Sequence, residues 1–165
     1  MMMNEDTFFK IIKRTLSYTS LEDTIAFDEF LIQQLAQKTE KEIVQFHLRF
    51  LALRKRVDIF EVTKVAQRLS YNSSREVYNR FCNGIIASGK EFYDKTKQGK
   101  GFLEKKLDNN PSELKHLYYE GFGLVAAAAF YEKKGIAADW DAFLRNERRL
   151  LEVQSKKGND QELRR

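Results

Sequence analysis

Two titratable residues in the second half of the chain, His116 and Glu120, have the types of an acid–base pair. They are four positions apart, so they would share one face of a helix. Glu120 is the only charged residue between Leu117 and Tyr131, and burial there without a partner would raise the pKa of its carboxyl group. One hypothesis is therefore an enzyme with a pocket containing Glu120 and His116. The alternative is a structural carboxylate satisfied by a core tyrosine or by an arginine from another helix.

The chain has one further histidine and a single cysteine. His47 lies between Phe46 and Phe50 on the apolar stripe of a predicted helix, which is typical of a histidine in the core or at its boundary. Cys82 cannot form an internal disulfide, and no histidine lies near it on its own helix to activate the thiol. We expect this thiol to be inert. With so few imidazole and thiol groups, we predict no metal site and no cofactor.

Sequence motifs typical of catalysis or of nucleic-acid binding are absent. The chain contains no phosphate-binding P-loop, no GxSxG elbow, no HExxH and no CxxC. It also lacks a helix-turn-helix, zinc-finger or RNP-type pattern. The sequence therefore favours a noncatalytic protein, and we assign no catalytic residue beyond the two candidates above.

Positive charge is concentrated in the middle of the chain. Residues 49–106 contain fourteen Lys or Arg and six Asp or Glu, a net charge of +8, whereas the whole chain carries +5. Such an excess suits an acidic partner or a phosphate backbone, but it is also typical of a solvated helix surface. Two clusters are candidate binding residues: Arg49, Arg54, Lys55 and Arg56 in the first, and Arg145, Arg148 and Arg149 in the second.

The composition predicts a folded, helical protein. Hydrophobic residues make up 42% and aromatic residues 13% of the 165 residues, which is enough for a core without disulfides or metal. One proline and eight glycines leave too few turn signals for a protein of many short strands. The uncharged run over residues 121–131 is too short to span a membrane. Because no secretory signal begins the chain, we expect a cytoplasmic location and no membrane.

Capping boxes mark several helix starts, since a capping side chain is followed three positions later by a carboxylate. They predict helices over 20–35 and 39–56, and two more beginning at 58 and 73. The four pairs are Ser20 with Asp23, Thr39 with Glu42, Asp58 with Glu61, and Ser73 with Glu76. Apolar periodicity adds helices over 5–16 and 139–154, and two short helices within 90–109 separated at the glycines.

The segment 110–134 has the strongest helical pattern. Asn110, Pro111 and Glu113 suit its first turn, as cap, first helical residue and capping-box carboxylate. Its body is apolar on nearly every face, which is typical of a helix buried on all sides.

These patterns together predict an all-α fold. We expect a compact multi-helix bundle of about seven to eight helices around a buried central helix at residues 110–134. A single helical domain would cover residues 1–156, because no repeat, linker or composition shift divides the chain. Residues 157–165 would form a frayed basic tail.

The segment IIASGKEFYD, residues 85–94, resembles the L-I-x-x-G-[KR]-E-x-[FY] signature of an uncharacterised bacterial family, the domain of unknown function numbered 4240. Residues 8–12, 38–50 and 114–135 are similar to that family's first, third and closing helices, so the resemblance covers about residues 5–140. Gly84 and Cys82 stand where the family usually has tryptophan and arginine. If those positions line a pocket, the resemblance implies that its shape and charge differ in this chain.

The leading hypothesis is a noncatalytic intracellular domain that binds another protein through a face of the bundle. Many aromatic residues suited to interface hot spots favour it. The resemblance implies a helical bacterial domain and keeps an immunity or defence association open. Nucleic-acid binding through the basic region 49–106 and an enzyme with a Glu120/His116 pocket are the alternatives. The sequence does not determine the partner or the oligomeric state.

Overall fold

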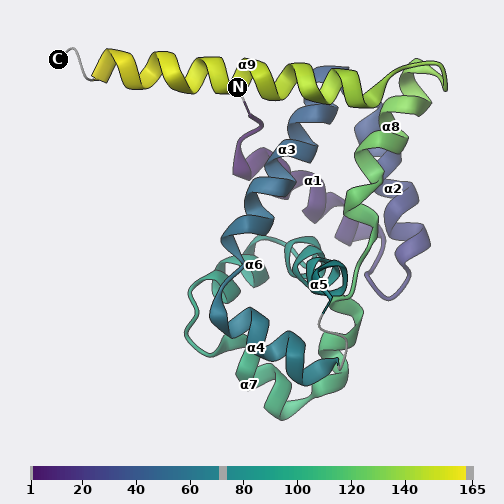
Figure 1. The fold of residues 1–165 in the computed structure, drawn as a ribbon. Helices are drawn as coiled ribbons and strands as arrows, with labels where there is room; N and C mark the ends of the chain where they lie inside the picture. The colour runs from purple at the N-terminus through teal and green to yellow at the C-terminus, as the bar shows by residue number, and fades with distance from the viewer. Residues whose placement is uncertain (1, 71–73, 163–165) are drawn as a thin grey trace.

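A computed structural model describes residues 2–70 and 74–162, with side chains as far as residue 157. Within those ranges the chain consists of helices joined by short turns, with no strand (Figure 1). The predicted all-α class is therefore confirmed. In this part of the chain, no helix is both long and apolar enough to cross a membrane.

The described residues contain nine α-helices and two short 3₁₀ helices, more than the seven to eight helices predicted. The two short helices expected within 90–109 are confirmed as the sixth and seventh. In chain order the elements are α1 (Glu5–Tyr18), α2 (Thr24–Ala36), α3 (Glu40–Arg56), α4 (Phe60–Leu69), α5 (Arg75–Ala87), α6 (Lys90–Lys97), α7 (Phe102–Asn109), η1 (Pro111–Leu117), η2 (Gly121–Gly123), α8 (Val125–Lys134) and α9 (Trp140–Glu162).

Local capping explains where α2 and α3 begin. At α3 the predicted capping box forms, since the Thr39 hydroxyl accepts from the Glu42 N–H at 3.2 Å and the Glu42 carboxylate accepts from the Thr39 N–H at 2.9 Å. The start of α2 was predicted too early, because Asp23 rather than Ser20 is its N-cap. Either residue type can cap a helix, and local sequence does not choose between them.

The predicted starts of α4 and α5 differ from the structure in another way. Helix α4 has no side-chain cap, because Asp58 accepts hydrogen bonds from Arg75 and Tyr78 of α5 instead. Ser73, the cap predicted for α5, lies outside the described residues, and Ser74 caps this helix. Asp58, which was expected to cap α4, thus connects the turn between α3 and α4 to α5.

Aromatic rings from three separate segments form the centre of the core. Phe8 of α1 stacks on Phe46 of α3 at 4.6 Å, and Phe50 of α3 stacks on Phe122 of η2 at 4.9 Å. All four side chains are buried. Such ring pairs contribute about 1 kcal/mol each beyond the area they bury. They hold α1 and α3 against the segment before α8, while α5 packs between α3, α4 and α6 (Figure 1).

The predicted continuous central helix at 110–134 is wrong. This segment forms η1, a turn, η2 and then α8, and α8 is its only α-helical part. Helix α8 is also not buried on all sides, because Leu124 at its cap is 65% exposed and Tyr131 is 37% exposed.

Contacts with α5 interrupt the segment. The N–H of Tyr119 donates to the carbonyl of Arg80 at 3.0 Å, and the Asn83 amide donates to the carbonyl of Tyr119 at 3.0 Å. Gly84 permits this close approach, because a Cβ at that position would overlap the backbone of Leu117. Backbone groups that would continue the helix are therefore satisfied by another helix instead.

The last helix, α9, continues beyond its predicted end to Glu162. Near its start, Trp140 packs edge-on against His47 of α3 with ring centroids 5.5 Å apart. From there α9 passes over α3, and its carboxyl-terminal part extends past the rest of the fold (Figure 1). The single domain over 1–156 and the frayed tail over 157–165 stay predictions, and residues 163–165 lie outside the described residues.

Candidate functional site

The structure does not pair Glu120 with His116. The backbone leaves the helical conformation at Tyr118, where ψ is 76°, so the expected shared helix face does not exist. The Glu120 side chain is 66% exposed and forms an ion pair with Arg80 at 3.2 Å. The prediction that Glu120 is buried is therefore wrong, and its partner is Arg80, an arginine of another helix. His116 is half-buried, and burial lowers the pKa of its imidazole.

A core tyrosine, Tyr119, is hydrogen-bonded to a different carboxylate, that of Asp28 in α2. The Asp28 carboxylate accepts this hydrogen bond from the hydroxyl of Tyr119. Burial raises the pKa of Asp28, and burial together with this carboxylate raises the pKa of Tyr119. Gly121 lies against the pair, with no space for a Cβ. The contact fastens α2 to the turn before α8, and nothing in the local sequence around Asp28 indicates it.

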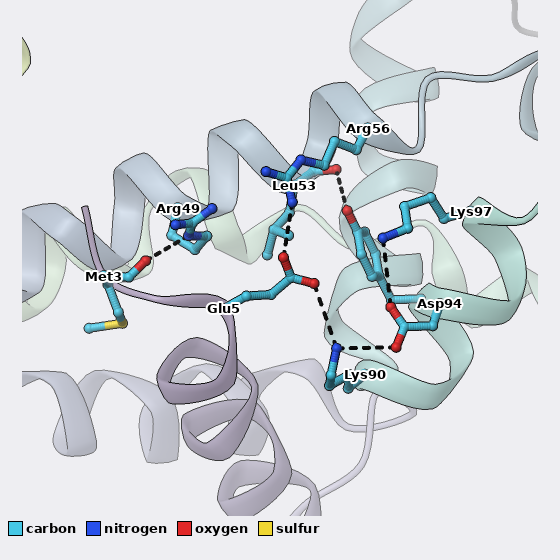
Figure 2. Close-up of polar contacts among 9 residues, drawn as sticks. Met3, Glu5, Arg49, Leu53, Arg56, Lys90, Asp94 and Lys97 are labelled. Atoms are coloured by element: carbon cyan, nitrogen blue, oxygen red, sulfur yellow. Dashed lines mark hydrogen bonds and ion pairs between the residues drawn. The ribbon is translucent and has the colours of Figure 1, made fainter. Parts of the chain in front are cut away.

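Two of the seven basic candidates, Arg49 and Arg56, bind other parts of the fold. Figure 2 shows the Arg49 guanidinium pointing at the carbonyl of Met3, with an Nε to oxygen distance of 2.6 Å. Arg56 forms an ion pair with Glu5 of α1 at 2.9 Å. Both side chains therefore attach the amino-terminal segment to α3.

The pair between Arg56 and Glu5 belongs to a longer set of ion pairs that we call the Glu5 network (Figure 2). Lys90 of α6 lies 3.7 Å from Glu5 and 3.1 Å from Asp94, and Lys97 lies 3.9 Å from Asp94. A hydrogen bond to Asp94 and the charge of Glu5 raise the pKa of Lys90. Opposite charges thus alternate through the network, which joins α1, α3 and α6.

The other basic candidates include three that line one cavity, which we call the basic cleft. Arg54 and Lys55 come from α3, and Arg148 comes from α9. The cavity has a volume of about 690 Å³, within the range of known ligand pockets. Its remaining lining residues are Met2, Leu48, Leu51, Ala52, Asp58, Arg75, Tyr78, Asn79, Cys82, Leu151 and Glu152.

Among the described residues, no carboxylate lies within ion-pair distance of these three cations. The Arg54 guanidinium lies 5.2 Å from the ring centre of Phe50, which is a cation–π contact. Burial lowers the pKa of Arg54, and the nearby charge of Arg75 lowers it further. A half-buried cation without a counter-ion has lost part of its hydration and has no opposite charge to compensate, so an anion entering the cleft would be stabilised there.

A fourth cation, Arg75 of α5, is already neutralised. It donates to Asp58 at 2.8 Å, and the Tyr78 hydroxyl donates to the same carboxylate at 2.9 Å. These hydrogen bonds hold the pKa of Asp58 below its usual range. Asp58, Arg75 and Tyr78 therefore form a part of the cleft wall whose charges are paired within the chain.

The thiol of Cys82 lies in the cleft wall but is poorly suited to chemistry. The residue is 1% exposed, and burial raises the pKa of its thiol to about 11. The neighbouring Tyr78 hydroxyl also has a raised pKa, chiefly because of burial. Both groups therefore keep their protons at neutral pH, and neither is an activated nucleophile.

Arg145 and Arg149 do not line the cleft, although they are exposed on α9 close to Arg148 in sequence. The structure thus divides the seven candidates between the cleft, the amino-terminal segment and free surface. It adds Arg75 and Tyr78, which the sequence did not indicate as site residues. The only local signal was the carboxylate at Asp58, and it was interpreted as a helix cap.

A family model described as "Protein of unknown function (DUF4240)" matches residues 3–133. The chain belongs to this family. The resemblance found from residues 85–94 is thereby confirmed, whereas a bacterial source stays a prediction. A search of curated proteins and a search of solved structures each found no match.

The DUF4240 match contains only part of the basic cleft. It includes the walls formed by α3 and α5 but ends at residue 133, before α9 begins. Arg148 therefore lies outside the matched segment. Of the two departures from the DUF4240 signature, Cys82 lies in the cleft wall, whereas Gly84 lies against Leu117 in the core.

Proposed function

We propose that this chain is a noncatalytic binding protein that recognises an acidic segment of another protein in the basic cleft. One observation carries the proposal: Arg54 and Lys55 of α3 and Arg148 of α9 line the same cavity, and none of them forms an ion pair with a carboxylate of the described residues. Carboxylates of a bound segment would supply the missing counter-charges. The apolar lining, which includes Leu48, Leu51 and other side chains, favours a partner that is not purely ionic.

A protein partner is better supported than nucleic acid, because most of the basic middle is already neutralised within the chain. Of the fourteen Lys or Arg in residues 49–106, eight form ion pairs with carboxylates: Arg56, Lys64, Arg68, Arg75, Arg80, Lys90, Lys95 and Lys97. A nucleic acid would require a continuous track of free cations along its backbone. A local cleft with three cations that have no carboxylate partner in the described part of the chain suits a short acidic segment instead.

The state of the titratable groups in the cleft supports binding rather than catalysis. Asp58 is held as a carboxylate by Arg75 and Tyr78, while Cys82 and Tyr78 keep their protons. A general base needs a pKa near the working pH and free access to substrate. None of these groups meets both requirements.

A more specific version of this proposal is that the chain acts in immunity or defence. The bound protein would then be a toxin of the same cell, and binding would take place in the cytoplasm. The cleft would suit such a role if the toxin presents acidic residues, because opposite charges accelerate association.

The test compares the wild type with two variants, each changed at one exposed arginine of α9. The wild type, Arg148→Glu and the matched control Arg149→Glu would each be immobilised and exposed to an extract of the native host. We expect one protein to bind the wild type and Arg149→Glu stoichiometrically, and to bind Arg148→Glu about tenfold more weakly or worse. Equal recovery by all three versions, or recovery of a small molecule instead of a protein, would overturn the proposal.

A further inference from the structure

A second, smaller cavity adjoins the basic cleft. It has a volume of about 180 Å³ and is lined by residues of α4 and α5 together with one residue after η1: Thr63, Ala66, Gln67, Arg75, Val77, Tyr78 and Tyr118. Arg75 and Tyr78 line both cavities, so these two side chains form the wall between them. The two cavities are thus neighbouring parts of one surface rather than separate sites.

Several polar groups around the small cavity are already hydrogen-bonded, and the amide of Gln67 lies exposed at its edge. The Thr63 hydroxyl donates to the carbonyl of Ile59, and the Tyr118 hydroxyl donates to the carbonyl of Ala66 at 3.3 Å. Arg75 and Tyr78 both donate to Asp58, as described above. Apart from the Gln67 amide, a polar occupant would find few partners here, whereas an apolar one would bury its surface without leaving these hydroxyl groups unpaired.

The volume limits the size of the occupant. A cavity of about 150 Å³ in another protein holds one benzene molecule. The small cavity, at about 180 Å³, therefore has space for a single leucine, methionine or phenylalanine side chain. A complete small-molecule ligand generally needs 300 Å³ or more.

We propose that the two cavities bind one peptide segment in two parts: acidic side chains in the basic cleft, and a single large apolar side chain in the small cavity. This inference rests on the proposed function and names the kind of segment the partner presents. Arg75 and Tyr78 line both cavities, so the two parts lie on opposite sides of the same pair of side chains. An extended peptide covers about 3.3 Å per residue, so an apolar residue close in sequence to the acidic ones can reach the small cavity while they occupy the cleft.

The segment is selected by both parts of the site. Arg54, Lys55 and Arg148 attract any acidic chain, and their effect falls with added salt. The apolar side chain contributes by burial, which salt does not screen. Only a segment with both features in the right spacing obtains the full affinity.

Two short fluorescent peptides test this. The first contains aspartate, glutamate, serine and glycine only, and the second is identical except that leucine replaces the serine two positions from the last acidic residue. Fluorescence anisotropy would measure their Kd values on the wild-type chain, with the acidic peptide also measured on Arg148→Glu. We expect the leucine peptide to bind at least about tenfold more tightly on the wild type, which corresponds to burying one leucine side chain.

A variant of the small cavity separates its effect from that of the cleft. Gln67 is exposed at the edge of the small cavity, so Gln67→Trp would cover it with little effect on the core. The matched control is Gln33→Trp, an equal change at an exposed position of α2 that lines neither cavity. Thermal unfolding would verify that both variants fold.

The expected result is that Gln67→Trp removes the advantage of leucine but still binds the acidic peptide, whereas Gln33→Trp behaves like the wild type. The inference is overturned if leucine gives no advantage on the wild type, or if the advantage persists in Gln67→Trp. Failure of the proposed function gives a different result: neither peptide binds the wild type, or Arg148→Glu binds the acidic peptide as well as the wild type does.

Discussion

On one face of α3, Arg56 lies in the Glu5 network, where carboxylates and cations alternate (Figure 2). On another face, Arg54 and Lys55 line the basic cleft together with Arg148, with no carboxylate in ion-pair contact among the described residues. The pKa values show the contrast. Carboxylates raise the pKa of Lys90 in the network, while burial lowers the pKa of Arg54 in the cleft.

This difference arises within a run of three consecutive basic residues. Successive side chains of an α-helix are turned by 100° from one another, so Arg54, Lys55 and Arg56 cannot all face the same partner. Arg56 therefore contributes to holding the fold together, whereas its two neighbours are left for something outside the chain. A basic cluster in a sequence is consequently a mixture of structural and binding residues until the helix is placed among its neighbours.

The largest expected effect is a loss of binding when two cleft cations are reversed. In Lys55→Glu/Arg148→Glu, the cleft would repel acidic peptide, and the Kd of the leucine-containing peptide should rise at least about a hundredfold. Anisotropy titration would measure it. The matched control, Arg56→Glu/Arg149→Glu, makes the same change in net charge on the same two helices and should change the Kd by less than about threefold, a residual long-range effect that salt screens. Equal losses in both double variants would mean that net charge, and not the cleft, controls binding.

The second effect is a loss of folding stability at low pH, caused by His47 of α3. Burial and the charges of Arg148 and Arg54 lower the pKa of His47 to about 4, whereas an exposed histidine titrates near 6.5. The unfolded chain therefore takes up a proton that the folded chain refuses as the pH falls from about 6.5 to 4. Stability is lost over that window, by up to about 3 kcal/mol at pH 4.

His47→Phe should remove this contribution while keeping the ring contacts with Trp140 and Phe50. Urea denaturation of the wild type and the variant at pH 7 and pH 4.5 would measure it. We expect the wild type to lose more stability than His47→Phe between the two pH values. Identical pH dependence would show that His47 is accessible to protons in the folded state.

Acidic peptide in the cleft should raise the pKa of His47, because its carboxylates would offset the charges of Arg54 and Arg148. An NMR titration of His47 with and without the peptide would detect this rise.

A moderate effect is expected at Arg49, which the sequence grouped with the cleft cations. Arg49→Met keeps the aliphatic stem but leaves the carbonyl of Met3 without its donor. Stability should fall by about 1–2 kcal/mol in urea denaturation, with peptide affinity unchanged. Arg145→Met, at an exposed position of α9, is the control and should leave both quantities as they are. A loss of peptide affinity in Arg49→Met would return this residue to the binding site.

The smallest effect is expected for the exposed ion pair of the Glu5 network. The side chain of Arg56 is 49% exposed, so its pair with Glu5 should contribute less than about 1 kcal/mol. A double-mutant cycle with Arg56→Gln and Glu5→Gln would measure the coupling, which should shrink further at high salt. A coupling above about 2 kcal/mol would mean that the network acts as a cooperative unit and not as separate surface pairs.

Some features of the fold follow from local sequence because their causes are local. The capping box at Thr39 and Glu42 forms as predicted, since both hydrogen bonds join groups three residues apart. The break between α6 and α7 also follows from nearby glycines, including Gly101 with a φ of 83°. By contrast, Asp58 matched the capping pattern equally well but binds Arg75, seventeen positions away.

The candidate site was less predictable than the fold. Arg54, Lys55 and Arg148 were among the basic candidates, but no sequence pattern separates them from Arg49 and Arg56. Their roles depend on which partner each side chain meets across helix boundaries. The small cavity, with its wall at Arg75 and Tyr78, had no signal in the sequence at all, because its lining comes from two helices and a turn.

The amino-acid sequence by itself determined that this protein is all-α, where most of its helices lie, and that it belongs to a recognisable family. Composition, helical periodicity and the signature over residues 85–94 are properties of the chain that need no three-dimensional information. Only the tertiary structure decided that segment 110–134 is broken and that Glu120 is exposed. The reason is that α5 competes for the backbone of Tyr119 through Arg80 and Asn83. Likewise, only the packing of α9 over α3 brings Arg148 to the same cavity as Arg54 and Lys55.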